Sequence, residues 1–204
     1  MDATYPLQLS VDYPDRPLNR TTTLFRVFTV LPIAVVLGAV SAWTFHGRHG
    51  GEIALAGGTL FLAPLLMILF RQKYPRWWFD WNRELLRFSD RVLVYLFLMD
   101  DRYPSTDEEQ AVHVDMAYPD AQRELNRWLP LVKWLLAIPH YLVLFFLGIG
   151  ALGAVVMAWV AILFTGRYPR GLFDYVEGVI RWQNRVLAYA ALLVTDRYPP
   201  FSLR

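Results

Sequence analysis

The sequence predicts an all-α integral membrane protein. In this prediction four transmembrane helices form two tandem hairpins, each hairpin is followed by an amphipathic interfacial helix, and short β segments lie on the cytoplasmic side. Three observations predict this class: 55% of the residues are apolar and 16% are aromatic, the apolar residues gather in long blocks, and the two halves of the chain resemble each other. Such a composition favours the bilayer as solvent over a soluble fold.

The first element of each half is a short extended segment. QLSVDYP, from Gln8, and VHVDMAYP, from Val112, alternate apolar and polar residues and end at a Tyr-Pro pair. Alternation predicts a strand, and a residue before proline disfavours helix. The two strands are expected to pair with each other, or with the chain near 101–103 and 196–198, in a small cytoplasmic cap.

Apolar blocks supply the predicted spans. The blocks cover 24–45, 53–70 and 129–165, and the third is broken only by Lys133 and His140. About 20 apolar residues cross the hydrocarbon core as a helix, so each of the first two blocks spans once and the third, roughly 35 residues long, spans twice.

The third block needs a turn in this interpretation. Gly148, Gly150 and Gly153 are the best place for it, because glycine reverses the chain without a steric penalty. The alternative is one long tilted helix, although about 15 surplus residues exceed what ordinary tilt absorbs. The predicted spans are therefore 24–45, 53–70, 130–147 and 151–165.

A charged helix is predicted after each hairpin, over 77–99 and 172–194. In both helices charged residues recur every three or four positions and line one face, while apolar residues line the other. Such a helix is suited to the headgroup plane, with its tryptophans in the interfacial belt. Both ends of each helix carry a basic Tyr-Pro signature, which favours an in-plane or shallowly dipping helix over a crossing one.

The two halves, 1–105 and 106–204, are predicted to be tandem repeats. The string at 73–104 matches the string at 167–199, and Tyr74 maps to Tyr168 at an offset of 94. The first span of each half also has an interior proline and a cation near its start, Arg26 or Lys133. An even number of crossings in each repeat gives parallel repeats that enter the membrane from the same side.

The distribution of cations sets the expected orientation. The loop between the first two spans holds only Arg48 and the glycine turn holds none, whereas the other Lys and Arg residues lie in or beside segments on the opposite side. This asymmetry, and the lack of a visible secretory signal in 1–23, predict a multi-pass protein of the bacterial inner membrane with both termini in the cytoplasm.

The string GRYPRGLFDYVEGVIRWQNRVLAYAALLVTDRYPPF, at 166–201, resembles a bacterial membrane family known as domain of unknown function 4389. The first half is similar to a degenerate second copy, in which Trp77 stands where the second half has Gly171, and Lys73 where it has Arg167. The resemblance implies a membrane location and fold, and it brings no activity or catalytic residue.

Basic and aromatic residues of the charged helices and of the Arg-Tyr-Pro segments form the candidate lipid or partner site. Guanidinium groups bind phosphates with two hydrogen bonds, and basic clusters on an amphipathic helix attract anionic lipid. The alternatives are ion pairs with Glu84 and Glu177 along a solvated face, and tyrosines that anchor the interface beside element-ending prolines. The candidate residues are Arg87, Arg91, Arg181, Arg185, Arg167, Tyr168, Arg170, Arg197, Tyr198 and Trp182.

Other chemistry has little support in the residues. The segment HGRHGGE, at 46–52, carries two histidines and a glutamate, but a glycine-rich exterior loop is the simpler interpretation, and no metal or other cofactor is predicted. The chain has no cysteine, which excludes thiolate catalysis and disulfides, and its net charge of +2 does not indicate nucleic-acid binding.

The leading functional hypothesis is a non-enzymatic inner-membrane protein that binds anionic lipids, as a scaffold, a homo-oligomer or an accessory subunit of a larger membrane complex. A small oligomeric transporter, pore or lipid-moving protein is the alternative. The weakest alternative is a haem-binding or enzymatic membrane protein that uses His140, an ionisable group inside the third apolar block.

Overall fold

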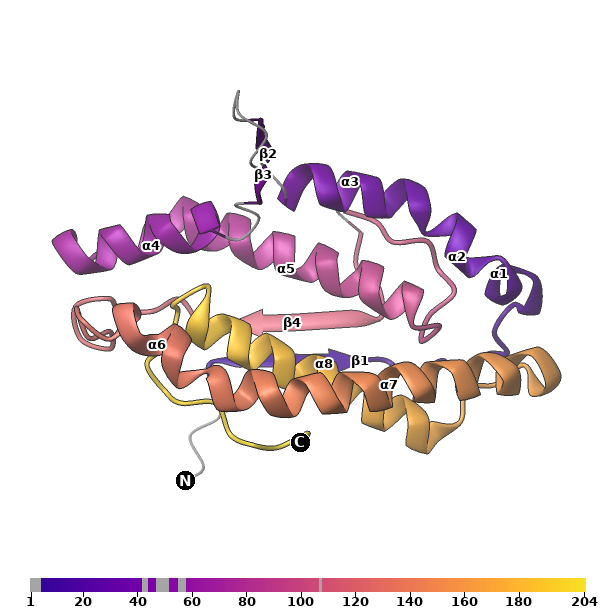
Figure 1. Ribbon diagram of the computed structural model, residues 1–204. Helices are drawn as coiled ribbons and strands as arrows, with labels where there is room; N and C mark the ends of the chain where they lie inside the picture. Colours follow the sequence, from indigo (N-terminus) through magenta and orange to yellow (C-terminus); the bar gives the residue numbers. More distant parts are fainter. Residues whose placement is uncertain (1–4, 42–43, 47–51, 55–57, 107) are drawn as a thin grey trace.

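A two-stranded sheet and two long helices form the centre of the computed structural model (Figure 1). The structure describes residues 5–41, 44–46, 52–54, 58–106 and 108–204. Strand β1 (Leu7–Val11) pairs antiparallel with β4 (Val112–Met116), so the two predicted extended segments pair with each other.

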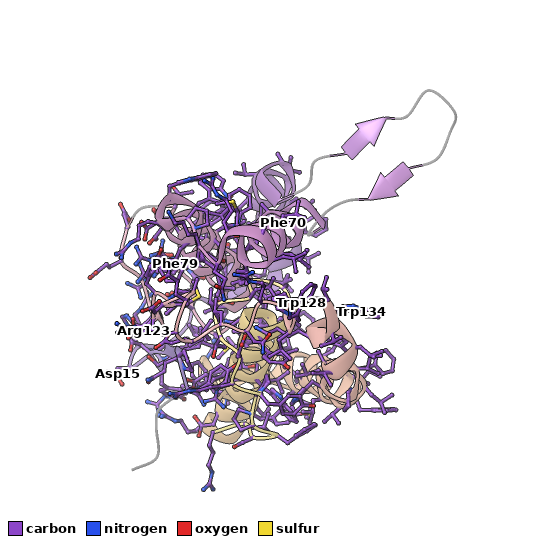
Figure 2. The ribbon with its side chains drawn as sticks, turned by 90° about the vertical axis from the view of Figure 1, so that its left-hand side faces the viewer. Asp15, Phe70, Phe79, Arg123, Trp128 and Trp134 are labelled. Atoms are coloured by element: carbon purple, nitrogen blue, oxygen red, sulfur yellow. The ribbon has the colours of Figure 1, made fainter. Side chains whose placement is uncertain are left out.

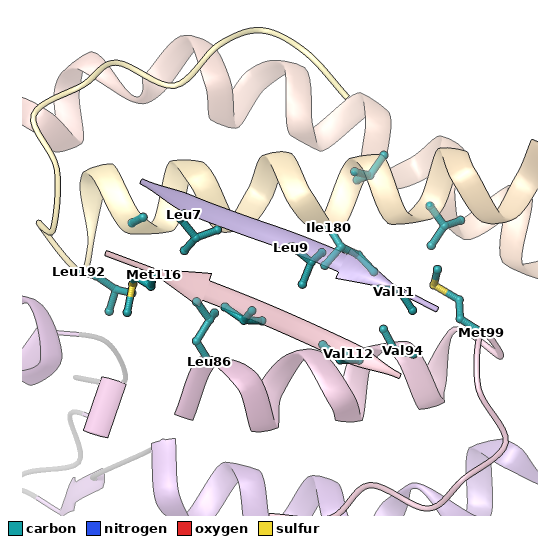
Figure 3. Close-up of a cluster of buried hydrophobic side chains, with 14 of the residues drawn as sticks. Leu7, Leu9, Val11, Leu86, Val94, Met99, Val112, Met116, Ile180 and Leu192 are labelled. Carbon is teal, nitrogen blue, oxygen red and sulfur yellow. The ribbon is translucent and has the colours of Figure 1, made fainter. Parts of the chain in front are cut away.

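Helices α5 (Arg76–Leu96) and α8 (Arg170–Ala190) pack on one face of this sheet. Burial alternates along both strands, because one face packs on the helices and the other is exposed. Helix α8 contacts β1 and α5 contacts β4, so each strand lies against the long helix of the other half. Figure 3 shows this core, in which the labelled side chains are Leu7, Leu9, Val11, Leu86, Val94, Met99, Val112, Met116, Ile180 and Leu192.

The same two helices are also covered on the side away from the sheet. Tyr95 and Val92 of α5 belong to a buried cluster with Val30 and Ile33 from the first apolar block, and α8 has an equivalent cluster against the second half's helices. The predicted helices at 77–99 and 172–194 therefore do not lie free at a membrane interface. They are central elements of a folded domain.

The predicted spans 24–45 and 53–70 are wrong. The first block is broken into α1 (Arg20–Leu24), α2 (Arg26–Thr29) and α3 (Leu31–Ser41). Pro32 lacks the N–H that would bond to Phe28, which accounts for the break between α2 and α3. The second block carries the end of the strand pair β2 (Thr44–His46) and β3 (Glu52–Ala54) and then α4 (Gly58–Arg71). Helix α4 has 14 residues, a length of about 21 Å that falls short of the hydrocarbon core.

The predicted hairpin of spans 130–147 and 151–165 is also wrong. Helix α6 (Pro130–Leu136) ends at Ala137, and α7 (Ile138–Thr165) then runs through all three predicted turn glycines without interruption. From Ile138 onward the third block therefore forms one long helix, as in the alternative to the hairpin. Small residues of α7, Ala151, Ala154 and Ala158, pack in the core beside α8, and this packing outweighs the cost of a helical glycine, about 1 kcal/mol.

A single helix of the described part of the chain, α7, is long and apolar enough to cross a membrane by length and composition. Four transmembrane helices and a multi-pass topology are therefore not supported. In the structure α3 lies against α5 and α7 lies along α8, so one side of each of these apolar helices covers a central helix and the other side stays exposed.

The two sides of the molecule differ in polarity. In Figure 2 charged side chains gather on the side that carries Asp15 and Arg123, whereas Trp128 and Trp134 lie on the opposite side among apolar groups. Helices α1 and α6 both contact α7, and α2 contacts both α1 and α3, so these apolar helices form one connected group.

Candidate functional site

Helices α1–α3, α6 and α7 expose a large apolar surface, here called the apolar face. Phe145 and Phe146 of α7 are each 63% exposed, and Phe164 is 78% exposed. Soluble monomers rarely expose contiguous apolar patches beyond a few hundred Å², and larger ones mark membrane or protein contacts. Further members of the apolar face are Leu24, Phe25, Val27, Phe28, Leu31, Val35, Leu131, Trp134, Leu135, Leu142, Ile149, Leu152, Val156, Met157 and Val160.

The outer face of the sheet is polar. Gln8 and Ser10 of β1 are exposed between buried neighbours, as are His113 and Asp115 of β4. His113 Nε2 lies 3.0 Å from a carboxylate oxygen of Asp12 on this face. The molecule is thus amphipathic as a whole, and not only within its individual helices.

Arg87 of α5 and Arg181 of α8 each donate hydrogen bonds to a strand of the sheet. Arg87 donates from Nε and Nη2 to the carbonyl of Val114, at 3.1 and 3.0 Å, and Arg181 donates from Nε to the carbonyl of Leu9 at 2.9 Å. Leu9 and Val114 face each other across the sheet. Each guanidinium also pairs with the glutamate that was its alternative partner in the sequence.

Arg91 of α5 and Arg185 of α8 each donate a hydrogen bond to the segment that follows their own helix. Arg91 Nη1 donates to the carbonyl of Ser105 at 2.9 Å, and Arg185 Nη1 donates to the carbonyl of Arg204 at 2.6 Å. Both residues are only 9% exposed. A lipid phosphate at these four arginines would compete with backbone carbonyls that already accept their hydrogen bonds.

The structure does not bring the remaining candidate residues into one site. Arg167 and Arg197 are exposed, whereas Tyr168 is 1% exposed. Arg170 lies over the ring of Tyr13, with its guanidinium carbon 4.5 Å from the ring centroid. Arg167, Tyr168 and Arg170 lie at the start of α8, whereas Arg197 belongs to the segment that follows α8.

His140 is enclosed by aromatic side chains of the second half. Trp182 Nε1 donates to His140 Nδ1 at 3.1 Å, Phe201 stacks on the imidazole with 4.1 Å between ring centroids, and the Tyr198 ring lies 4.7 Å away. Two predicted lipid or partner residues, Trp182 and Tyr198, therefore contact His140. The part of the chain that the structure describes holds no group of three or more His, Asp or Glu residues able to bind a metal. The HGRHGGE segment lies largely outside that part.

A hydrogen bond between Asp90 of α5 and Asn184 of α8 joins the two long helices. Asn184 Nδ2 donates to Asp90 Oδ2 at 2.7 Å, and both residues are buried. Their numbers differ by 94, the offset of the two strings in the sequence. Burial raises the pKa of Asp90 from 3.8 to about 7, and the hydrogen bond from Asn184 partly opposes this rise.

Sequence reasoning assigned no role to two buried cations. Lys133 Nζ donates to the carbonyl of Thr195 and pairs with Asp196, at 2.7 Å in each case. Arg26 Nη1 donates to the carbonyl of Asp100, also at 2.7 Å. The signal available in the sequence was an isolated cation at the same place in two apolar blocks, because ionisable groups in such blocks are costly and usually functional.

Residues 128–202 match the family model described as Domain of unknown function (DUF4389). The match confirms the resemblance seen at 166–201, and it extends to α6 and α7. Residues 1–127 lie outside the match, so it supports the family for the second half alone. No curated protein and no solved structure matches the chain.

Two kinds of hydrogen bond each occur twice in the structure, at similar places in the two halves of the chain. Tyr13 donates from its hydroxyl to the carbonyl of Tyr168, and Tyr118 donates in the same way to the carbonyl of Tyr74, at 2.5 Å in both cases. The backbone N–H groups of two asparagines also donate to aspartates at matching positions, Asn19 to Asp101 and Asn126 to Asp196. The family description assigns no activity to the DUF4389 region.

Proposed function

We propose that this chain is a non-enzymatic, lipid-interacting protein of the bacterial inner membrane that inserts its apolar face into one leaflet. In this proposal it serves as a scaffold or accessory subunit at the cytoplasmic surface. The observation that carries the proposal is the apolar face itself, which lies opposite the charged side of the molecule. Each Å² of apolar surface removed from water contributes about 25 cal/mol to such insertion.

The neighbour of α7 favours an in-plane position over a crossing one. Helix α7 has 28 residues, a length of about 42 Å, and α8 lies along it. Helix α8 carries Asp174, Glu177, Arg181 and Arg185. A charge at the bilayer centre costs about 3 kcal/mol or more, so a crossing α7 would carry a costly partner into the hydrocarbon. With α7 in the plane of the leaflet, these charges stay on the water side.

We also infer that the first half is a diverged second copy of the DUF4389 domain. The matching contacts of Tyr13 and Tyr118, and of Arg87 and Arg181, support this inference. In this interpretation each copy contributes its strand to the long helix of the other copy. Asp90 and Asn184 then occupy equivalent positions and meet near the axis that relates the copies.

Flotation with lipid vesicles tests the membrane proposal. The purified chain is mixed with phosphatidylcholine vesicles, with and without phosphatidylglycerol, and centrifuged through a density gradient. We expect the wild type to float with both kinds of vesicle, because apolar insertion does not require lipid charge. A variant with Phe145→Glu and Phe146→Glu should stay at the bottom.

The matched control places the same two charges on the polar sheet face, as Gln8→Glu with Ser10→Glu. This control should float as the wild type does. Equal flotation of the Phe145/Phe146 variant and the wild type would overturn the proposal, as would a wild type that floats with neither vesicle.

A further inference from the structure

A groove opens on the apolar face between the α1–α2 segment and α7. Its volume is about 220 Å³. Apart from Thr23 and Arg26, its lining consists of apolar and aromatic side chains, and Trp159 closes one wall by donating from Nε1 to the carbonyl of Thr23 at 3.2 Å. Several lining residues are well exposed, such as Val27 at 66% and Val156 at 56%. The groove is therefore continuous with the surface proposed to enter the membrane.

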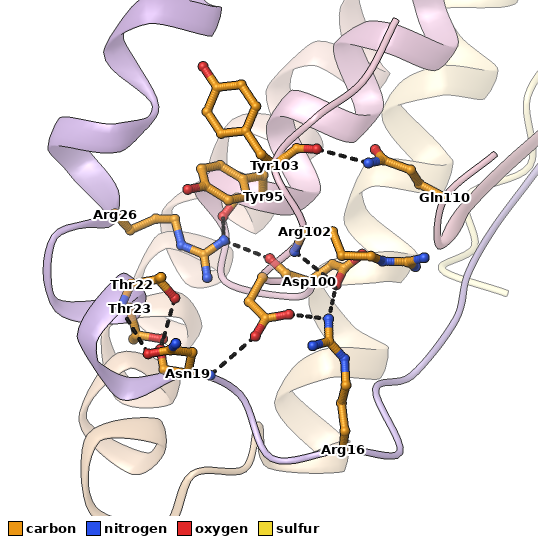
Figure 4. A network of polar contacts seen from close by, with 11 residues as sticks. Arg16, Asn19, Thr22, Thr23, Arg26, Tyr95, Asp100, Arg102, Tyr103 and Gln110 are labelled. Atoms are coloured by element: carbon orange, nitrogen blue, oxygen red, sulfur yellow. Dashed lines mark hydrogen bonds and ion pairs between the residues drawn. The ribbon is translucent and has the colours of Figure 1, made fainter. Parts of the chain in front are cut away.

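Arg26 borders this groove and is only partly hydrogen-bonded (Figure 4). Its Nη1 donates to the carbonyls of Tyr95 and Asp100, at 3.2 and 2.7 Å, and its guanidinium carbon lies 4.0 Å from the centroid of the Tyr95 ring. Its Nε and Nη2 have no hydrogen-bond partner among the described residues, and water does not reach them freely because Arg26 is only 2% exposed. Buried N–H groups on a charged side chain are costly when they lack an acceptor.

The nearby carboxylates do not satisfy Arg26, because other cations already hold them. Arg16 pairs with Asp100 and Asp101, and Arg102 Nε pairs with Asp100 Oδ2 at 2.9 Å. Three arginines and two aspartates leave this cluster with one positive charge in excess. The guanidinium of Arg26 cannot lose its proton at physiological pH, so the excess charge is permanent.

The matching position in the second half lacks this surplus. Lys133 lies 5.1 Å from the centroid of the Tyr189 ring, much as Arg26 lies over Tyr95. Its ammonium group, however, both donates to a backbone carbonyl and pairs directly with Asp196. The two halves thus each place a cation beside a tyrosine ring, but Arg26, unlike Lys133, pairs with no carboxylate among the described residues and has two donors without an acceptor there.

We propose that the groove at Arg26 binds one anionic lipid. The oxygens of a phosphate or carboxylate headgroup accept hydrogen bonds from Nε and Nη2, which present two adjacent donors, and part of an acyl chain fills the apolar groove between Val27 and Val156. This inference rests on the proposed membrane function, because the ligand reaches the groove from the leaflet in which the apolar face lies.

Native mass spectrometry of the full chain tests the site. The protein is purified in mild detergent, incubated with phosphatidylglycerol, oleate or phosphatidylcholine, and the lipids retained per chain are counted. We expect one anionic lipid to be retained per chain. Whether that lipid is phosphatidylglycerol or oleate shows whether the site binds a phosphate or a carboxylate headgroup. Phosphatidylcholine should be retained at least tenfold less. Equal retention of phosphatidylcholine would overturn the proposal.

Two variants attack the site from different directions. The Arg26→Lys variant keeps the positive charge but replaces the guanidinium with an ammonium group, as at Lys133 in the second half. The Val156→Trp variant fills the groove and leaves Arg26 unchanged. Each should reduce retention at least tenfold, whereas the controls Arg123→Lys and Val160→Trp should retain lipid as the wild type does.

The outcomes separate this site from the proposed function. Variants that still float with vesicles but lose the retained lipid support the groove. A Val156→Trp variant that still retains one anionic lipid per chain would overturn the lipid site in the groove, even if the Arg26→Lys variant fails to fold. A wild type that does not float at all overturns the membrane proposal instead.

Discussion

Asp90 is a buried carboxyl that accepts a hydrogen bond from the side-chain amide of Asn184, and its titration should control stability near neutral pH. Burial raises its pKa from 3.8 to about 7. Because the folded-state pKa lies above the unfolded value, the stabilisation is complete below about pH 4 and is lost as pH rises to about 7. A shift of this size corresponds to about 4 kcal/mol of unfolding free energy.

The variant Asp90→Asn should remove this pH dependence, because an amide does not ionise. Urea unfolding between pH 4 and pH 8 measures it: the wild type should lose stability across the window, and the variant should lose much less. The same slope in both proteins would show that Asp90 does not titrate as described.

A variant at Arg181 tests whether the arginines of the long helices stabilise the fold. Its substitution by glutamine removes hydrogen bonds to the carbonyls of Leu9 and Leu203, and should lower the free energy of unfolding by about 2 kcal/mol. Vesicle flotation should stay unchanged. Arg123→Gln, at an exposed position, is the matched control and should alter neither property. Loss of flotation by the Arg181 variant with unchanged stability would favour the lipid role predicted from the sequence.

At the scale of elements, the glycines of α7 distinguish a continuous helix from a hairpin. No atom of the described residues lies within 4 Å of a methyl group added at Gly148 or Gly153, so alanine at both positions should stabilise the helix by about 1–2 kcal/mol in total. At Gly150 the added methyl would lie 2.5 Å from the Tyr175 hydroxyl oxygen, and alanine there should destabilise the protein.

Thermal unfolding in detergent measures these glycine variants. The double variant should have a higher Tm than the wild type, and Gly150→Ala a lower one. A double variant that unfolds at a lower temperature would indicate a turn at these glycines, as in the hairpin that the structure excludes.

The strands and the two long helices were predicted correctly, because each has a periodic pattern within its own segment of the sequence. The strands follow from alternation, and the helices at 77–99 and 172–194 correspond to Arg76–Leu96 and Arg170–Ala190. The spans were mispredicted because apolar length does not reveal what lies beside a segment. Pro32 and Pro139 were signals for the breaks that the structure shows, whereas nothing local reveals that α8 covers one side of α7.

The candidate site was predictable only in part, for a related reason. The spacing of Arg87 and Arg181 shows that they share a helix face, but a charge pattern does not identify the acceptor. Their acceptors are carbonyls of strands that lie far away in the sequence. The apolar face and the groove at Arg26 likewise arise from helices that meet only in the folded chain.

At the scale of the whole molecule, we propose that the amphipathic domain lies on one leaflet with α7 in the membrane plane. The depth of α7 tests this claim most directly. The chain has no native cysteine, so single cysteines can carry spin labels at Leu142, Leu152 and Phe164, which are exposed near the start, middle and end of α7. Paramagnetic resonance in lipid nanodiscs, with oxygen and a nickel chelate as relaxants, then reports the depth of each label.

If α7 lies in the membrane plane, we expect similar depths at all three positions, within a single leaflet. A label at Leu152 that lies near the bilayer centre, with the other two at opposite surfaces, would mean that α7 crosses the membrane and would contradict its in-plane position.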